Sequence, residues 1–292
     1  MNIALYSIVI FCWGTSWLAI TFQLGEVAPQ VSIAWRFLIA SLILFGWCFI
    51  RGINLSFPWR SHLNWIVLGI FLFCVNYICI YFGSFYLASG MVALIFSTLT
   101  LFTVFNGFIF FKYPIRWPIL IGGIVGIAGL SVIFSNEIRA TVWSLESGVV
   151  KGFLWVLVAT FFASIGMLLS GEMQAKKMPL VQSNAFSMLY GSLLIVAYTG
   201  IGDIKFGFDV SYNYVVSLIY LALFASVLGF GSYLKLVGNI GADKASYVNI
   251  FTPVIALLLS TLFEDYQWSR VGLVGVVLII VGNVLVLFAK TK

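Results

Sequence analysis

The chain has 292 residues, of which 62% are hydrophobic and 8% are charged, and its formal net charge is +6. Its mean hydropathy is +1.12. Roughly a quarter of the residues of a soluble globular domain are charged, so this composition excludes a soluble protein. It indicates a polytopic helical membrane protein.

Ten apolar stretches of about 20 residues follow one another along the chain, and each is long enough to cross a bilayer as a helix. They lack the alternation of apolar and polar residues that marks membrane-spanning strands. Prolines stand at or beside several of their ends, where a missing N–H costs least. We therefore predict an all-α integral membrane protein with ten transmembrane helices. The predicted spans are 3–22, 30–50, 63–82, 85–111, 116–134, 149–170, 180–200, 213–234, 241–263 and 270–289.

The second half of the chain repeats the first at an offset of 152 residues, most visibly between 89–114 and 241–266. Each copy contains five spans, an odd number, so the second copy must be inverted in the membrane. We predict one transporter domain over 1–292, made of repeat one (1–134), a linker (135–148) and repeat two (149–292). Inverted repeats are typical of secondary transporters that alternate access around a site at the bilayer midplane. Matched pairs are Ala93 with Ala245, Ser97 with Asn249, Thr100 with Thr252, Phe111 with Phe263, and Tyr81 with Tyr233.

The basic residues predict the orientation of the chain. With the N-terminus in the cytoplasm, ten Lys and Arg residues lie inside and four outside, and Arg36 lies within a span. Basic residues favour cytoplasmic loops, so both termini are expected to be cytoplasmic. This bias also accounts for the net charge, so no nucleic-acid partner is expected.

Polar residues in the middle of spans are the candidates for a substrate site, because they are expensive in a bilayer. Asn249 and Ser97 occupy equivalent positions in the two repeats, and Thr252 and Thr100 follow one turn later. The alternative is structural: hydroxyls bond to their own helix, and an amide bridges two helices. Pro253 frees the carbonyl of Asn249 for a gating or binding role, or simply kinks its helix.

Four further residues are candidates. Trp13 and Asn76 would contribute to a substrate-binding wall or to packing, and Tyr81 and Tyr233 would form gates or interfacial anchors. For Arg36 we favour a side chain that snorkels outward, with an anion-attracting charge at the outer mouth of the pathway as the alternative.

No Asp or Glu lies in the middle of a span, so we expect facilitated or weakly coupled transport rather than exchange of protons for cations. The four cysteines lack metal-ligand spacing, and the spans lack a cluster of catalytic side chains. We therefore expect no metal, no cofactor and no enzymatic activity. Small-molecule substrates and the lipid bilayer are the expected partners.

Six segments of the chain carry a recognisable pattern: CWGTSWLA (12–19), WRFLIASLIL (35–44), YLASGMVALIFSTLTLF (86–102), GGIVGIAGL (122–130), TPVIALLLSTLFED (252–265) and VGLVGVVLIIVGNVLVL (271–287). In this order they resemble the EamA-type transporters of the drug/metabolite transporter superfamily. That resemblance implies export of amino acids or other small metabolites across a bacterial inner membrane. The chain departs from the family pattern at Leu101, where a proline is common, and at Lys112, where glutamate is common. We therefore expect the fourth span to be straighter than the ninth.

Other functions fit the same sequence. Within transport, drugs, nucleosides and sugars are alternative substrates, and a lipid scramblase or a structural membrane protein is the alternative to transport. Glycine-rich faces on the fifth and tenth spans permit close helix packing. We expect contact within the chain there, in a monomer, with a homodimer as the alternative.

Overall fold

The computed structural model describes residues 2–115, 117–133, 148–241, 245, 248–267 and 269–287. The regular elements of this part are all helices, and seven of them are long and apolar enough to cross a membrane. Most of the predicted linker, 135–148, lies outside the described residues. The seven helices are α1 (Asn2–Thr21), α2 (Pro29–Ile50), the run Trp59–Ser84, the run Ser89–Phe111, α9 (Gly148–Ala175), α10 (Leu180–Ile201) and the run Tyr212–Ile240.

Three shorter apolar helices complete the described part: α7 (Trp117–Ile133), α14 (Val248–Phe263) and α15 (Arg270–Leu287). Helix α1 lies at the centre of the bundle and contacts α14, the run Tyr212–Ile240 and the run Ser89–Phe111. The protein is a multi-pass membrane protein.

Two of the long helices contain a π-helical segment at the same place in the predicted repeat. The first run consists of α3 (Trp59–Leu68), η1 (Gly69–Val75) and α4 (Asn76–Ser84). The second consists of α11 (Tyr212–Tyr220), η2 (Leu221–Phe230) and α12 (Gly231–Ile240). Their π segments begin at Gly69 and Leu221, which are separated by the repeat offset of 152 residues. Such segments are rare and often lie at functional sites.

The helix of the fourth span is broken, contrary to our expectation that it would be the straighter one. It consists of α5 (Ser89–Phe96) and α6 (Leu99–Phe111), separated at Ser97 and Thr98, whereas α14 is continuous through Pro253. The Ser97 hydroxyl donates to the carbonyl oxygen of Leu94 at 2.6 Å, and Thr98 donates in the same way to Ile95 at 2.7 Å. Adjacent hydroxyls that bond back to the helix compete with its own N–H groups. The prediction considered only the proline and was wrong.

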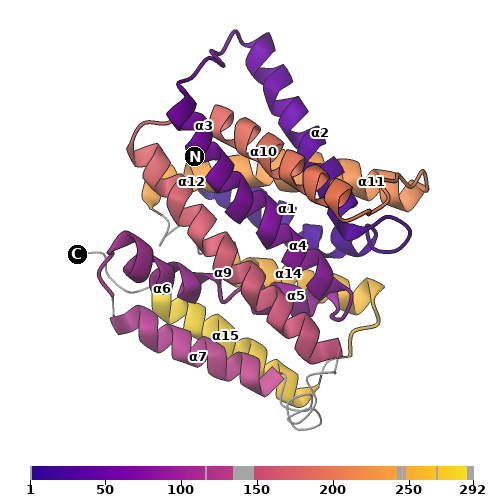
Figure 1. Cartoon of the computed structure of the whole chain (residues 1–292). Helices are drawn as coiled ribbons and strands as arrows, with labels where there is room; N and C mark the ends of the chain where they lie inside the picture. The colour runs from indigo at the N-terminus through magenta and orange to yellow at the C-terminus, as the bar shows by residue number, and fades with distance from the viewer. Residues whose placement is uncertain are drawn as a thin grey trace.

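Helices α7 and α15 lie side by side along one edge of the bundle, away from α2 and α10 (Figure 1). Their glycines allow the backbones to touch. A Cβ atom added to Gly129 would lie 2.6 Å from the carbonyl oxygen of Gly275, and one added to Gly275 would lie 2.6 Å from that of Gly129. The glycine faces therefore serve contact within the chain, as predicted.

Candidate functional site

A small internal cavity lies where helices from the two halves of the chain meet. Its volume, taken as the space that the centre of a water molecule can occupy, is about 30 Å³. One water molecule needs about 10–15 Å³ by this measure, so the cavity holds a few waters and no metabolite in this closed conformation. The lining residues are Trp13, Ser16, Trp17, Ile20, Asn76, Tyr77, Ile80, Phe96, Met167, Phe230, Asn249 and Thr252.

Four of the predicted substrate-binding residues meet at this cavity: Trp13, Asn76, Asn249 and Thr252. Trp13 is fixed by its indole N–H, which donates to the carbonyl oxygen of Ala225 in η2 at 3.2 Å. The Asn76 amide donates to the carbonyl oxygen of Leu72 in η1 at 3.1 Å. Lining side chains from α1 and α4 are therefore held by backbone carbonyls of the two π segments.

Three polar atoms of the lining are buried and have no hydrogen-bond partner: the indole nitrogen of Trp17, the amide oxygen of Asn76 and the amide nitrogen of Asn249. An unpaired buried polar atom costs roughly 1–3 kcal/mol, so native proteins rarely keep several together. Two of these atoms are donors and one is an acceptor. The residues that line the cavity therefore keep unused hydrogen-bonding capacity of both kinds, donor and acceptor.

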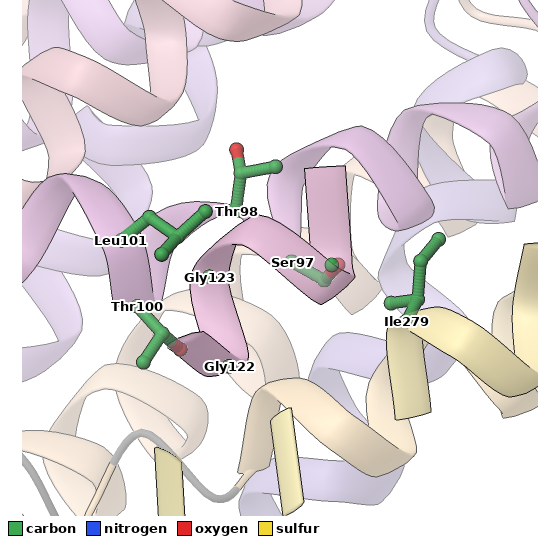
Figure 2. A pocket seen from close by; sticks show the side chains of 8 residues that line it. Ser97, Thr98, Thr100, Leu101, Gly122, Gly123 and Ile279 are labelled. Atoms are coloured by element: carbon green, nitrogen blue, oxygen red, sulfur yellow. The ribbon is translucent and has the colours of Figure 1, made fainter. Parts of the chain in front are cut away.

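Ser97 and Thr100 lie elsewhere. They line a separate pocket with residues of α7 and α15, and Figure 2 shows them beside Gly122, Gly123 and Ile279. That pocket offers only about 10 Å³ to water-sized spheres, which leaves no more than a single water site. The structure thus separates the two members of each predicted pair, Ser97 from Asn249 and Thr100 from Thr252.

Arg36 does not snorkel outward, which corrects the favoured prediction. Its side chain is 1% exposed and lies between α2, α4 and η2. Nε donates to the Ser226 hydroxyl at 3.0 Å, and Nη2 donates to the Tyr77 hydroxyl at 3.4 Å. The charge is held inside the bundle because hydroxyls and the Tyr77 ring, 4.5 Å from the guanidinium carbon, are available there.

The two predicted gating tyrosines are both buried. Tyr81 follows the lining residue Ile80 on α4, and its side chain is 0% exposed. Tyr233 lies on α12, three residues after the lining residue Phe230, and its ring centroid is 4.8 Å from that of Trp13. Pro253 follows Thr252 on α14 and is also buried.

Several lining residues escaped the sequence analysis, although a signal for them was present. Trp17 and Ser16 line the cavity but were not among the predicted site residues. Together with Trp13 and Ile20 they occupy positions i, i+3, i+4 and i+7, which is one face of a helix. Tyr77, Phe96, Met167 and Phe230 carry no such signal, because nothing distinguishes them from other apolar or aromatic residues of the spans.

The acidic residue Asp209, in the loop before α11, has a structural role. The backbone N–H of Ser211 donates to Asp209 at 2.8 Å and its hydroxyl donates at 2.7 Å. These two hydrogen bonds lower the pKa of the Asp209 carboxyl. Ser211 in turn caps the first turn of α11 by accepting from the backbone N–H of Tyr214. Asp209 therefore supports the start of a helix.

A bundle of apolar helices that encloses a small, mainly apolar cavity between two sequence-related halves is typical of a membrane transporter. The sequence profile of the EamA-like transporter family matches residues 2–135 and 150–288, which is nearly the whole chain. The chain belongs to the EamA-like transporter family.

Similar proteins from other organisms agree with this assignment. An uncharacterized transporter in the trpA 3′ region of Buchnera aphidicola subsp. Schlechtendalia chinensis is 28% identical over 91% of this chain and 84% of its own length. Protein PagO of Salmonella typhimurium is 25% identical over 98% and 92%. The uncharacterized inner membrane transporter YedA of Escherichia coli K12 is 25% identical over 97% and 91%.

A solved crystal structure superimposes on the whole fold. It covers 100% of this chain and 99% of its own, with a TM-score of 0.72 and 17% sequence identity. At that identity the likeness concerns the fold alone.

Proposed function

We propose that this protein is a bacterial inner-membrane secondary transporter that exports amino acids or their analogues by alternating access around the internal cavity. The observation that carries the proposal is that three residues lining the cavity, Trp17, Asn76 and Asn249, each keep a buried polar atom without a partner. A free amino acid combines an ammonium group, which can donate to the amide oxygen of Asn76, with a carboxylate, which accepts hydrogen bonds. The apolar walls of the cavity would take the side chain.

The proposed architecture has ten spans in two inverted five-helix repeats. Helices α7 and α15 have 17 and 18 residues. At about 1.5 Å per residue they approach the thickness of the hydrocarbon core, roughly 30 Å. Counting α7, α14 and α15 with the seven longer helices supports ten crossings, an even number, with both termini in the cytoplasm.

Alternating access requires the cavity to open toward one side at a time. Tyr81 and Tyr233 lie on repeat-related helices, and both are shielded from solvent in this conformation. We assign the outer gate to Tyr81 and the inner gate to Tyr233. The carbonyl of Asn249, which Pro253 deprives of its helical partner, adds an acceptor on α14.

The test is counterflow in proteoliposomes with a panel of labelled amino acids. We expect saturable exchange by the wild type and a loss of about tenfold or more in Asn249→Ala, as follows from removal of one buried hydrogen-bonding group. Asn184→Ala is the matched control, because Asn184 is equally buried but does not line the cavity.

Each other outcome has a definite meaning. Normal exchange by Asn249→Ala would refute the assigned site while leaving a carrier. If the wild type moves no amino acid, the substrate class is refuted, and nucleosides, sugars and drugs are tested next. Lipid movement between leaflets without saturable solute flux would identify a scramblase.

A further inference from the structure

Arg36 is the only buried cation among the residues that the structure describes, and that part contains no buried Asp or Glu. The other described basic side chains are at least partly exposed, such as Arg51 at the end of α2. A charge inside a membrane protein is expensive, and it is normally paired or functional. Arg36 therefore needs an explanation beyond packing.

The hydrogen bonds of Arg36 leave its terminal fork open. Nε is engaged by Ser226 at 3.0 Å, whereas Nη2 makes only a long bond of 3.4 Å to the Tyr77 hydroxyl. Nη1 is buried and has no partner. Its described hydrogen-bond partners and the Phe37 ring, whose centroid is 5.2 Å from the guanidinium carbon, are all neutral, so the positive charge is not balanced by the described part of the chain.

The fork lies one side chain away from the cavity. Tyr77 lines the cavity, and the same ring lies against the guanidinium of Arg36, 4.5 Å from its carbon to the ring centroid. The hydroxyl of Tyr81, one turn later on α4, is also buried. A rotation of Tyr77 would therefore expose the unpaired Nη1 edge of the guanidinium to a solute in the cavity.

We infer that Arg36 is the subsite for a carboxylate group of the transported solute: one oxygen accepts from the unpaired Nη1, and the other replaces the Tyr77 hydroxyl on Nη2. This inference rests on the proposed function and specifies its substrate: the solute must carry a carboxylate. A guanidinium fork matches a carboxylate in two parallel hydrogen bonds. The carboxylate then balances the charge of the guanidinium directly, which removes the cost of an isolated buried charge.

The charge count selects a monoanionic group. One cation balances one carboxylate, whereas a phosphate monoester carries about −1.5 to −2 near neutral pH and would leave excess negative charge in the bundle. For the same reason a solute with an ammonium group and no carboxylate is repelled. The carrier is thus selective for acids over the corresponding amides, the opposite of a cation exporter.

The experiment uses the full-length protein in proteoliposomes and three labelled probes of similar size: L-leucine, 4-methylpentanoate and L-leucinamide. The first two carry a carboxylate and the third does not. We expect wild type to exchange leucine and 4-methylpentanoate at least about tenfold faster than leucinamide. Arg36→Gln loses the exchange of both acids, and Arg36→Lys keeps part of it because the charge remains without the fork.

Thermal stability in the absence of solute separates this role from a structural one. If Arg36 only ties α2 to η2, Arg36→Gln lowers the melting temperature. If its charge awaits a solute, Arg36→Gln melts at the same temperature as wild type or above it, because an unbalanced buried charge has been removed. Arg51→Gln is the matched control, since it makes the same change on the exposed end of the same helix.

The two proposals fail in different ways. Exchange of leucinamide as fast as leucine, or normal acid exchange by Arg36→Gln, overturns the carboxylate subsite and leaves the carrier intact. If no probe is exchanged, a binding measurement replaces the transport assay. The melting temperature of the protein is recorded at increasing concentrations of sodium 4-methylpentanoate, with equal concentrations of sodium chloride as the salt control. A rise in wild type that is absent in Arg36→Gln supports the subsite, and no rise in wild type refutes it.

Discussion

The contact between α7 and α15 leads to a prediction whose size follows from the geometry. In Gly129→Ala the new Cβ atom would lie 2.6 Å from the carbonyl oxygen of Gly275 and 2.8 Å from the backbone nitrogen of Ile279. Ordinary contact begins at 3.4 Å, so the helices must separate by about 0.8 Å. Overpacking of this kind costs about 1–3 kcal/mol, which exceeds the gain of up to about 1 kcal/mol from replacing a helical glycine with alanine.

Gly126→Ala provides the control on the same helix. A Cβ atom there meets nothing within 4 Å, so only the gain in helix propensity remains. We expect the melting temperature of purified Gly129→Ala in detergent to be several degrees below that of Gly126→Ala, since each kcal/mol of lost stability lowers it by about 2–4 °C. Equal melting temperatures would refute the close packing of α7 on α15. A change in oligomeric state without a loss of stability would favour the homodimer instead.

Two further substitutions test contacts between the repeats. The Glu264 carboxylate accepts hydrogen bonds from the backbone N–H and the hydroxyl of Ser89 at the start of α5. Glu264→Gln removes its charge, so the melting temperature should fall by the equivalent of about 1 kcal/mol. A fall no larger than that of the exposed control Asp265→Asn would contradict this role. Trp13→Phe keeps the ring contacts but removes the bond to Ala225, and about 1–3 kcal/mol of stability should be lost. An unchanged melting temperature would show that this bond is unimportant.

The helices themselves could be predicted from the sequence because a membrane span needs about 20 consecutive apolar residues, and its backbone hydrogen bonds must be satisfied within the helix. Pro29 and Pro179 mark helix starts in the structure as in the prediction. The break at Ser97 and Thr98 could not be predicted from the proline pattern, because it depends on which carbonyls the two hydroxyls reach. The same holds for the π segments, which form runs of ordinary apolar residues.

The site was predictable where a polar residue stands alone in an apolar helix. Asn249 and Asn76 reach the cavity for that reason. Repeat symmetry was less informative: it pairs Ser97 with Asn249, but the break in the first copy turns Ser97 toward α7 and α15. The burial of the Arg36 side chain was not predicted, because its hydrogen-bond partners Ser226 and Tyr77 lie 190 and 41 residues away in the sequence. No local pattern connects the three residues.

The matched π segments place the same irregularity beside the cavity in both halves of the chain. A π-helix bonds residue i to i+5, so its turns are wider than those of an α-helix. Gly69 and Leu221 begin such segments at positions that differ by the repeat offset. In each segment a backbone carbonyl accepts from a side chain that lines the cavity, Leu72 from Asn76 and Ala225 from Trp13. Rewinding either segment into a regular α-helix would therefore release a lining side chain and reshape the cavity.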